Sequence, residues 1–189
     1  MSEQPLSLTP PEIAAIARRI DRAWVLFWLI GAGKSTEGPR LAALLECDFV
    51  DVDEAIEEAA QLSVAEIFSQ FGEPYFRDGE RRVIARLIEE RHGVIATGGG
   101  AFVHPDTRAL ILAQAIAVWI DCDVDILVDR TARRGNRPLL QNGDPRETLA
   151  RLRDERTPHY AQAPIHVTSD RSPHTQTALA IIGAIERWL

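Results

Sequence analysis

Short apolar runs alternate with helix-like segments along most of this sequence, and that alternation limits the possible folds. The first run, Ala23–Leu29, is apolar at every position, which is typical of a strand buried on both faces. Four further runs have strand length, and they are Asp48–Val52, Gly93–Thr97, Ala117–Ile120 and Ile165–Thr168. Strands that alternate with helices predict an α/β domain in which helices cover both faces of a parallel sheet.

The segments between these runs carry helix start signals and helical spacing. Thr9–Ile20 opens with a capping threonine and two prolines, and its isoleucines fall on one face. The other expected helices are Ser35–Leu45, Asp53–Ala60, Ser63–Phe71, Glu73–Arg91, Pro105–Ala113, Val124–Arg133, Pro145–Tyr160 and Thr175–Leu189. A chain of 189 residues suits one domain, of which we expect residues 1–22 to be a helical extension.

Composition narrows the range of partners. The net charge of −7 argues against a nucleic acid or an anionic membrane. No apolar run reaches transmembrane length, and the N-terminus lacks a signal-peptide core. The two cysteines, Cys47 and Cys122, have no metal-binding spacing and are expected to be thiols in a reducing compartment. We therefore expect a cytoplasmic monomer.

A glycine-rich turn separates the first strand from the helix that follows it. Its residues are Gly31, Ala32, Gly33, Lys34, Ser35 and Thr36. In such a turn, backbone N–H groups converge on phosphate oxygens, Lys34 adds a charge, and the Ser35 hydroxyl can ligate Mg²⁺. A chance glycine-rich turn is the alternative. Because strand, turn and helix occur in the order that a phosphate-binding loop requires, we predict such a loop here.

Three residues near this turn depart from the usual pattern. A phosphate-binding loop ordinarily has glycine five positions before Gly33, where this chain has Trp28. An indole there could intrude on the loop. Pro39 lies beyond the first turn of the expected helix, where proline is costly. Glu37 adds a negative charge near the phosphates, although acids also suit a helix N-terminus. The three indicate an altered nucleotide site or a deliberately changed sequence.

Several short motifs follow the loop in series. They are Asp51-Val52-Asp53 at the second strand end, Phe76-Arg77 with Glu80, Gly98-Gly99-Gly100 at the third strand end, Arg137-Pro138-Leu139-Leu140, and Arg156 before Pro158 and Tyr160. In these motifs, and from about Val25 to the last strand, the chain resembles the shikimate kinases. The resemblance implies a five-stranded sheet in the order 2-3-1-4-5. It also implies transfer of the γ-phosphoryl group of ATP to the 3-hydroxyl of shikimate, with Mg²⁺ as the cofactor.

The two acids at the end of the second strand have a chemical and a structural interpretation. Strand ends in an open parallel sheet face the ligand crevice. Asp51 can hold Mg²⁺ through water, and Asp53 can accept hydrogen bonds from substrate hydroxyls and take the proton of the attacking one. The alternative is that they cap the next helix. Two acids at one strand end are costly without a cation, which favours the chemical interpretation.

Arg77 and Arg156 are the expected partners of the substrate carboxylate, because a guanidinium pairs with a carboxylate through two hydrogen bonds. Glu80 lies one turn after Arg77 and is expected to orient it, although a simple helical ion pair is the alternative. For Arg156 the alternative is a solvated helix face. The resemblance assigns the triple glycine, residues 98–100, to shikimate binding, and a flexible turn is its alternative.

The polar loop 134–144 is expected to act as a lid. The resemblance implies that Arg137, within it, neutralises the transferring phosphoryl group, and that Arg130 lies beside the adenine. The five histidines show no ligand spacing and are interpreted as surface or structural residues.

Two other functions remain open at this stage. One is a different small-metabolite kinase of the same architecture, such as a gluconate-type kinase. The other is a shikimate-binding protein without productive ATP binding, which the irregular residues Trp28, Glu37 and Pro39 favour.

Overall fold

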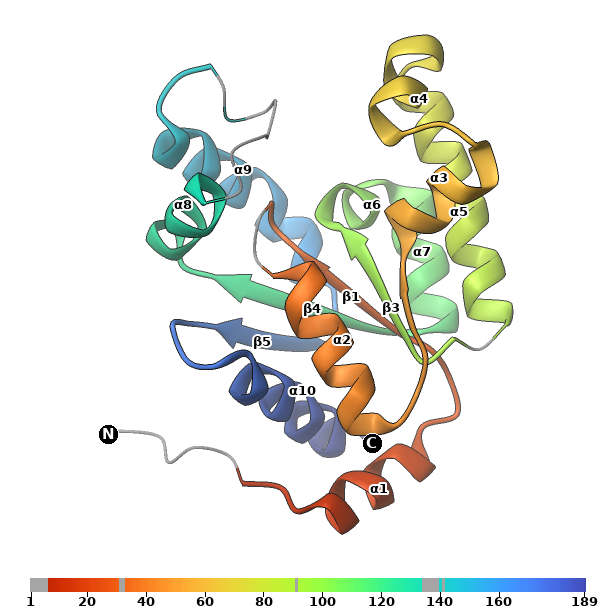
Figure 1. Cartoon of the computed structure of the whole chain (residues 1–189), viewed down its shortest axis with the longest axis vertical. Coiled ribbons are helices and arrows are strands. Elements are labelled where there is room, and N and C mark those ends of the chain that lie inside the picture. The colour runs from red at the N-terminus through yellow and green to blue at the C-terminus, as the bar shows by residue number, and fades with distance from the viewer. Residues whose placement is uncertain (1–6, 31–32, 91, 134–139, 141) are drawn as a thin grey trace.

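The computed structural model describes residues 7–30, 33–90, 92–133, 140 and 142–189, and its centre is a five-stranded parallel sheet (Figure 1). The strands are β1 Trp24–Trp28, β2 Phe49–Asp51, β3 Val94–Gly98, β4 Ile116–Cys122 and β5 Ile165–Ser169. Their spatial order is β2-β3-β1-β4-β5, which confirms the predicted order. β1 therefore lies in the middle of the sheet, and all of its residues are buried.

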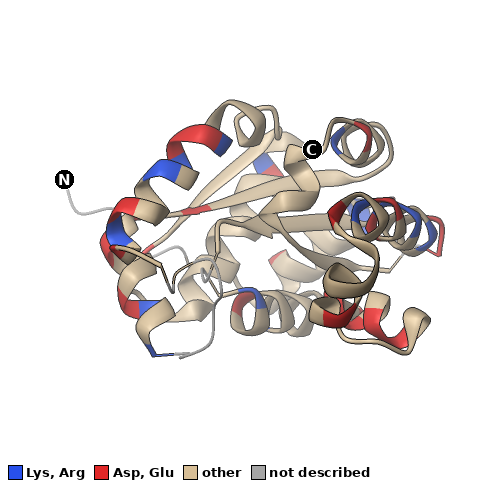
Figure 2. Cartoon of the chain, turned by 90° about the horizontal axis from the view of Figure 1, so that it is seen from above, with Lys and Arg blue, Asp and Glu red and all other residues tan. Residues whose placement is uncertain are grey.

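Helices cover both faces of the sheet. α2 Lys34–Leu45 and α10 His174–Trp188 pack against each other on one face, and α1 Pro10–Arg19 packs beside them. The remaining helices are α3 Val52–Ala60, α4 Val64–Phe71, α5 Glu73–Glu89, α6 Gly99–Val103, α7 Pro105–Gln114, α8 Val124–Ala132 and α9 Pro145–Tyr160. Positive and negative residues are interspersed along the outer helices (Figure 2).

The predicted helices and strands are present, with ends that differ by no more than two residues from the expected ones. Local signals explain this agreement. The backbone N–H of Thr9 donates to Oε2 of Glu12 at 2.7 Å in the capping box of α1, and Ile13 and Ile16 of that helix are buried. None of the helices in the described part of the chain has the length and apolar character needed to cross a bilayer.

The triple glycine is the main local difference from the prediction. Gly98 ends β3 as expected, but Gly99 begins the short helix α6, which was not predicted. Glycine favours helices poorly, so the sequence carries no helical signal there. Packing stabilises α6 instead, because the ring of Phe102 in α6 stacks on Phe27 of β1 with centroids 4.1 Å apart.

Candidate active site

The carboxyl ends of the strands meet at one edge of the sheet, where a cavity of about 410 Å³ opens. The predicted site residues that line it are Lys34, Ser35, Asp53, Arg77, Gly98, Gly99, Gly100 and Arg156, together with Glu80. They come from the starts of α2, α3 and α6, from α5, from the end of β3 and from α9. The fold thus brings the residues predicted to bind phosphate and those predicted to bind the substrate around one space, which we call the substrate cavity.

Lys34 lies between the two acids at the end of β2. Its Nζ donates to Oδ1 of Asp51 at 3.0 Å and to Oδ2 of Asp53 at 2.7 Å. Burial opposes the lysine charge, but the two carboxylates outweigh burial and raise the pKa of Lys34. Asp51 also caps α3, because its Oδ1 accepts from the backbone N–H of Asp53 at 2.8 Å. The cation that these two acids require is therefore Lys34, and the capping alternative applies to Asp51.

Arg77 and Glu80 form an ion pair in the wall of the substrate cavity. Nη1 of Arg77 donates to Oε2 of Glu80 at 2.6 Å, and Glu80 is only 1% exposed. Burial raises the pKa of Glu80, while the charge of Arg77 acts in the opposite direction. A Cβ added to Gly100 would collide with the Arg77 guanidinium. Glu80 therefore holds Arg77 against the triple glycine, which goes beyond an exposed helical ion pair.

Arg156 is tied to the same wall through Tyr160. Nη1 of Arg156 donates to the Tyr160 hydroxyl at 3.3 Å, and the Tyr160 ring is buried against Phe27 and Trp119. A Cβ added to Gly99 would collide with that hydroxyl. Tyr160 thus contacts both the triple glycine and an arginine from another helix. Its own motif was noted in the sequence, but its contact role was missed because only the fold brings it to Gly99.

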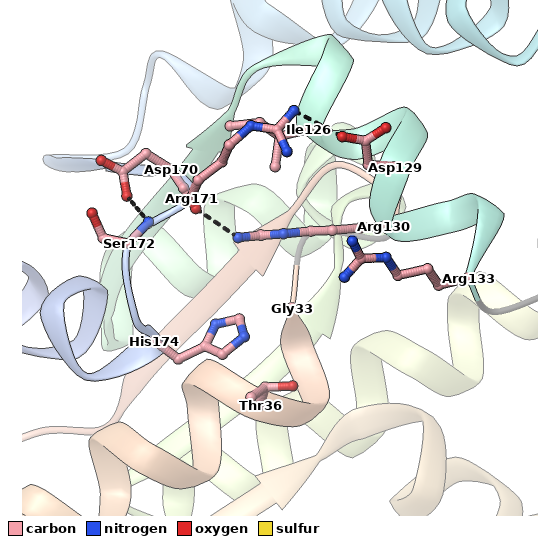
Figure 3. A pocket seen from close by; sticks show the side chains of 10 residues that line it. All are labelled: Gly33, Thr36, Ile126, Asp129, Arg130, Arg133, Asp170, Arg171, Ser172 and His174. Atoms are coloured by element: carbon pink, nitrogen blue, oxygen red, sulfur yellow. Dashed lines mark hydrogen bonds and ion pairs between the residues drawn. The ribbon is translucent and has the colours of Figure 1, made fainter.

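A second cavity, of about 380 Å³, shares Gly33 with the substrate cavity, and Figure 3 shows its lining. Gly33 and Thr36 form one side, and Arg130 extends across the space from α8. Nη2 of Arg130 donates to the carbonyl oxygen of Asp170 at 2.9 Å. Its position beside the turn makes this cavity the candidate site for a nucleoside, and we call it the nucleotide cavity.

Trp28 and Glu37, which the sequence marked as separate irregularities, contact each other. Nε1 of Trp28 donates to Oε2 of Glu37 at 2.9 Å, and the two residues are 3% and 0% exposed. A Cβ added to Gly33 would lie 3.1 Å from the carboxyl carbon of Glu37. The carboxylate of Glu37, in the first turn of α2, therefore lies next to Gly33, the residue before that helix. Trp28 is largely a core residue, although it also contributes to the lining of the substrate cavity.

Comparison with known proteins decides the family. The model of the shikimate kinase family matches residues 30–186 of this chain. A shikimate kinase from Novosphingobium aromaticivorans is 58% identical over 186 residues, which cover 96% of each protein. The chain belongs to the shikimate kinase family.

Solved structures of the shikimate kinase family have the same fold. The enzyme from Acinetobacter baumannii, in complex with shikimate, superimposes with a TM-score of 0.80 at 31% identity, covering 90% of this chain and 97% of that one. A gluconokinase from Sinorhizobium meliloti has a TM-score of 0.53 at 15% identity, covering 88% of this chain and 92% of that one, and shares the fold alone. The gluconate-type alternative is therefore weaker than the shikimate kinase interpretation.

The residues present fit the Mg²⁺ that this family implies. The hydroxyl of Ser35 and the carboxylate of Asp51 are hard oxygen donors, which Mg²⁺ prefers. Within the described ranges, no three His, Cys, Asp or Glu side chains gather as a metal site. A donor set this small suits an ion that takes most of its ligands from water and substrate phosphates.

Three predicted residues, Gly31, Ala32 and Arg137, lie outside the described residues.

Proposed function

We propose that this chain transfers the γ-phosphoryl group of ATP to the 3-hydroxyl of shikimate. The observation that carries the proposal is the substrate cavity. It joins two arginines and a triple glycine, suited to a hydroxy-carboxylic acid, to a lysine that follows a phosphate-binding turn. The 58% identity to a curated shikimate kinase supports the choice of substrate.

Arg77 and Arg156 bind the carboxylate of shikimate in this proposal. Each guanidinium already has a partner that fixes its direction, Glu80 for Arg77 and Tyr160 for Arg156. Fixed donors lose little conformational entropy when the substrate arrives. The backbone of the triple glycine, residues 98–100, approaches the ring of shikimate closely because it has no side chains.

Asp53 accepts the proton of the attacking hydroxyl, and Lys34 binds the phosphates. Without a nucleotide, Lys34 and Asp53 form an ion pair of 2.7 Å. Lys34 leaves Asp53 when a triphosphate offers it stronger partners. Catalysis then rests on positioning and on neutralisation of the phosphoryl charge, in which we include Lys34 and Arg137. Mg²⁺, held by Ser35 and Asp51, supplies further neutralisation of the phosphate oxygens when bound.

We also propose that the protein acts in the cytoplasm as a monomer. Cys47 and Cys122 are both free thiols, which suits a reducing compartment.

A second candidate function is a shikimate-binding protein with little kinase activity. The buried carboxylate of Glu37 next to Gly33 favours it, because a negative charge there opposes a triphosphate.

A coupled assay with shikimate and Mg·ATP separates the two functions. The kinase proposal expects turnover that depends on both substrates and that disappears in Asp53→Asn. Calorimetric binding of shikimate without any turnover, even at high Mg·ATP, supports the binding protein. Turnover with gluconate in place of shikimate contradicts both.

A further inference from the structure

Glu37 combines complete burial with an unusual set of partners. Its Oε2 accepts from the indole of Trp28 at 2.9 Å. Its Oε1 accepts from the Ser169 hydroxyl at 2.6 Å and lies 3.3 Å from Nδ1 of His174 and 3.8 Å from Nη1 of Arg130. These partners come from β1, the end of β5, α10 and α8. One carboxylate thus links the elements that surround the nucleotide cavity.

Ser169 relays the carboxylate to Arg130. Because the Ser169 hydroxyl donates its hydrogen to Glu37, its lone pairs are left to face Arg130. Both Nη1 and Nη2 of Arg130 donate to this oxygen at 3.2 Å. Two contacts of the guanidinium therefore depend on Glu37, the direct ion pair and the hydroxyl relay, while its bond to the carbonyl oxygen of Asp170 does not.

The charge of Glu37 works against an anionic ligand in two ways. It offsets the charge of Arg130, the guanidinium that extends across the nucleotide cavity. It also places a negative charge next to Gly33, at the turn where phosphate oxygens are to bind. Buried charges are screened by solvent much less than exposed ones, so both effects persist at physiological salt.

We propose that the buried charge of Glu37 weakens nucleotide binding, because it offsets the charge of Arg130 and lies next to Gly33. The inference rests on the proposed kinase function for its ligand, Mg·ATP. It concerns affinity alone and makes no claim about the phosphoryl transfer step.

The decisive variant is Glu37→Gln, which removes the charge and keeps the shape. The side-chain oxygen of the introduced glutamine still accepts from Trp28, and its amide can donate to Ser169, so the packing is retained. A donor in that place reverses the Ser169 hydrogen bond, while the bond from Arg130 to the carbonyl oxygen of Asp170 remains. We expect the dissociation constant of Mg·ATP, measured by calorimetry, to fall about tenfold. The interaction free energy of two charges a few ångströms apart in a protein is at least as large as the free energy of a tenfold change in affinity.

Arg130→Ala provides the test of mechanism. Because part of the effect passes through Arg130, Glu37→Gln should gain less in the Arg130→Ala background than in the parent, and the gain that remains reports the charge next to Gly33. Glu46→Gln is the matched control, since it removes the same charge from the exposed end of the same helix, about 13 Å away. It should leave the Mg·ATP affinity unchanged.

Shikimate binding separates failure of this inference from failure of the proposed function. Glu37→Gln should bind shikimate as the parent does, which also reports that it folds. If it does not fold, Glu37→Met, of similar volume and without charge, takes its place. Equal Mg·ATP affinity in the neutral variant and the parent overturns the inference, as does an equal gain in the Arg130→Ala background. Absence of Mg·ATP binding in both the parent and the neutral variant overturns the inference and the ATP-dependent function together.

Discussion

The indole N–H of Trp28 donates to the carboxylate of Glu37 across 2.9 Å, and both side chains are buried. Each residue supplies what the other needs, since a buried donor or acceptor left without a partner costs about 1–3 kcal/mol. The two irregularities of the glycine-rich turn are therefore one structural feature. Pro39 is separate from it, because Pro39 lies on the exposed side of α2.

Trp28→Gly is expected to tighten Mg·ATP binding and raise turnover while it destabilises the fold. The indole lines the substrate cavity beside Lys34, so its removal gives space for the phosphates. Loss of a buried tryptophan costs about 3–5 kcal/mol, and Glu37 also loses its donor. Calorimetry with Mg·ATP and urea unfolding measure the two effects.

Trp28→Phe is the control for this prediction, because it keeps most of the bulk and removes only the N–H group. It should destabilise the protein by about 1–3 kcal/mol and bring no gain in ATP affinity. If the parent already binds Mg·ATP with ordinary kinase affinity, and Trp28→Gly brings no gain, the indole is a core residue without influence on the nucleotide.

Lys34→Ala is expected to abolish phosphoryl transfer and to leave shikimate binding nearly intact. Lys34 is the cation at the start of α2, and a hydrogen bond to a charged group contributes about 1.5–3 kcal/mol. Initial rates and calorimetry with shikimate measure the two properties. Full turnover of the Ala variant would show that Lys34 does not bind the phosphates.

The raised pKa of Lys34 determines how its ion pairs contribute to the stability of the fold as the pH changes. Asp53 and Asp51 raise it against the effect of burial, so the ion pair contributes its full stability below the ordinary lysine pKa. The contribution is lost only as the pH rises through the raised value. The difference in unfolding free energy between the parent and Lys34→Met should therefore be constant between about pH 7 and pH 9.

Arg77→Ala is expected to weaken shikimate binding far more than ATP binding, and Arg156→Ala should do the same. Each substitution removes a carboxylate partner from the substrate cavity, while the nucleotide cavity is untouched. Titration of each variant with shikimate and with Mg·ATP gives the two affinities. Equal losses for both ligands would point to general misfolding.

Arg77→Ala should also change the pH dependence of stability. Burial raises the pKa of Glu80, and without Arg77 nothing comparable opposes it. A carboxyl with a raised pKa destabilises the fold in its charged form, so stability falls as the pH rises from the ordinary glutamate value through the raised one. The variant should be more stable near pH 5.5 than near pH 8. Arg77→Ala/Glu80→Gln has no such group and should lack that difference.

Much of the fold follows from local signals in the sequence. The continuous apolar run of β1 specifies a central strand, and Thr9 and Ser63 mark the starts of α1 and α4 through capping boxes. The strand order came from the family resemblance, because alternation of strands and helices fixes only the α/β class. Among site residues, Lys34 and Arg77 stood in recognisable motifs.

What the sequence could not provide are contacts between distant segments. Glu37 and Ser169 are 132 positions apart, and no pattern links a helix acid to a serine at the end of a strand. Tyr160 reaches Gly99 only because α9 packs beside α6. The indole of Trp28 has a buried acceptor in Glu37, a contact that a motif cannot specify.

The triple glycine offers a graded test of how closely the backbone must approach its neighbours. A Cβ added to Gly98 has no atom of the described structure within 4 Å, and one added to Gly99 meets the Tyr160 hydroxyl and lies 2.6 Å from the carbonyl oxygen of Trp28. That carbonyl belongs to the central strand and cannot move aside.

Gly99→Ala should therefore destabilise the protein by about 1–3 kcal/mol and reduce shikimate affinity, because α6 and Tyr160 must shift. Gly98→Ala is its matched control and should leave the melting temperature within a few degrees of the parent. Thermal unfolding and shikimate calorimetry on both variants give the comparison. Equal tolerance of the two alanines would show that Tyr160 does not fix the position of the triple glycine.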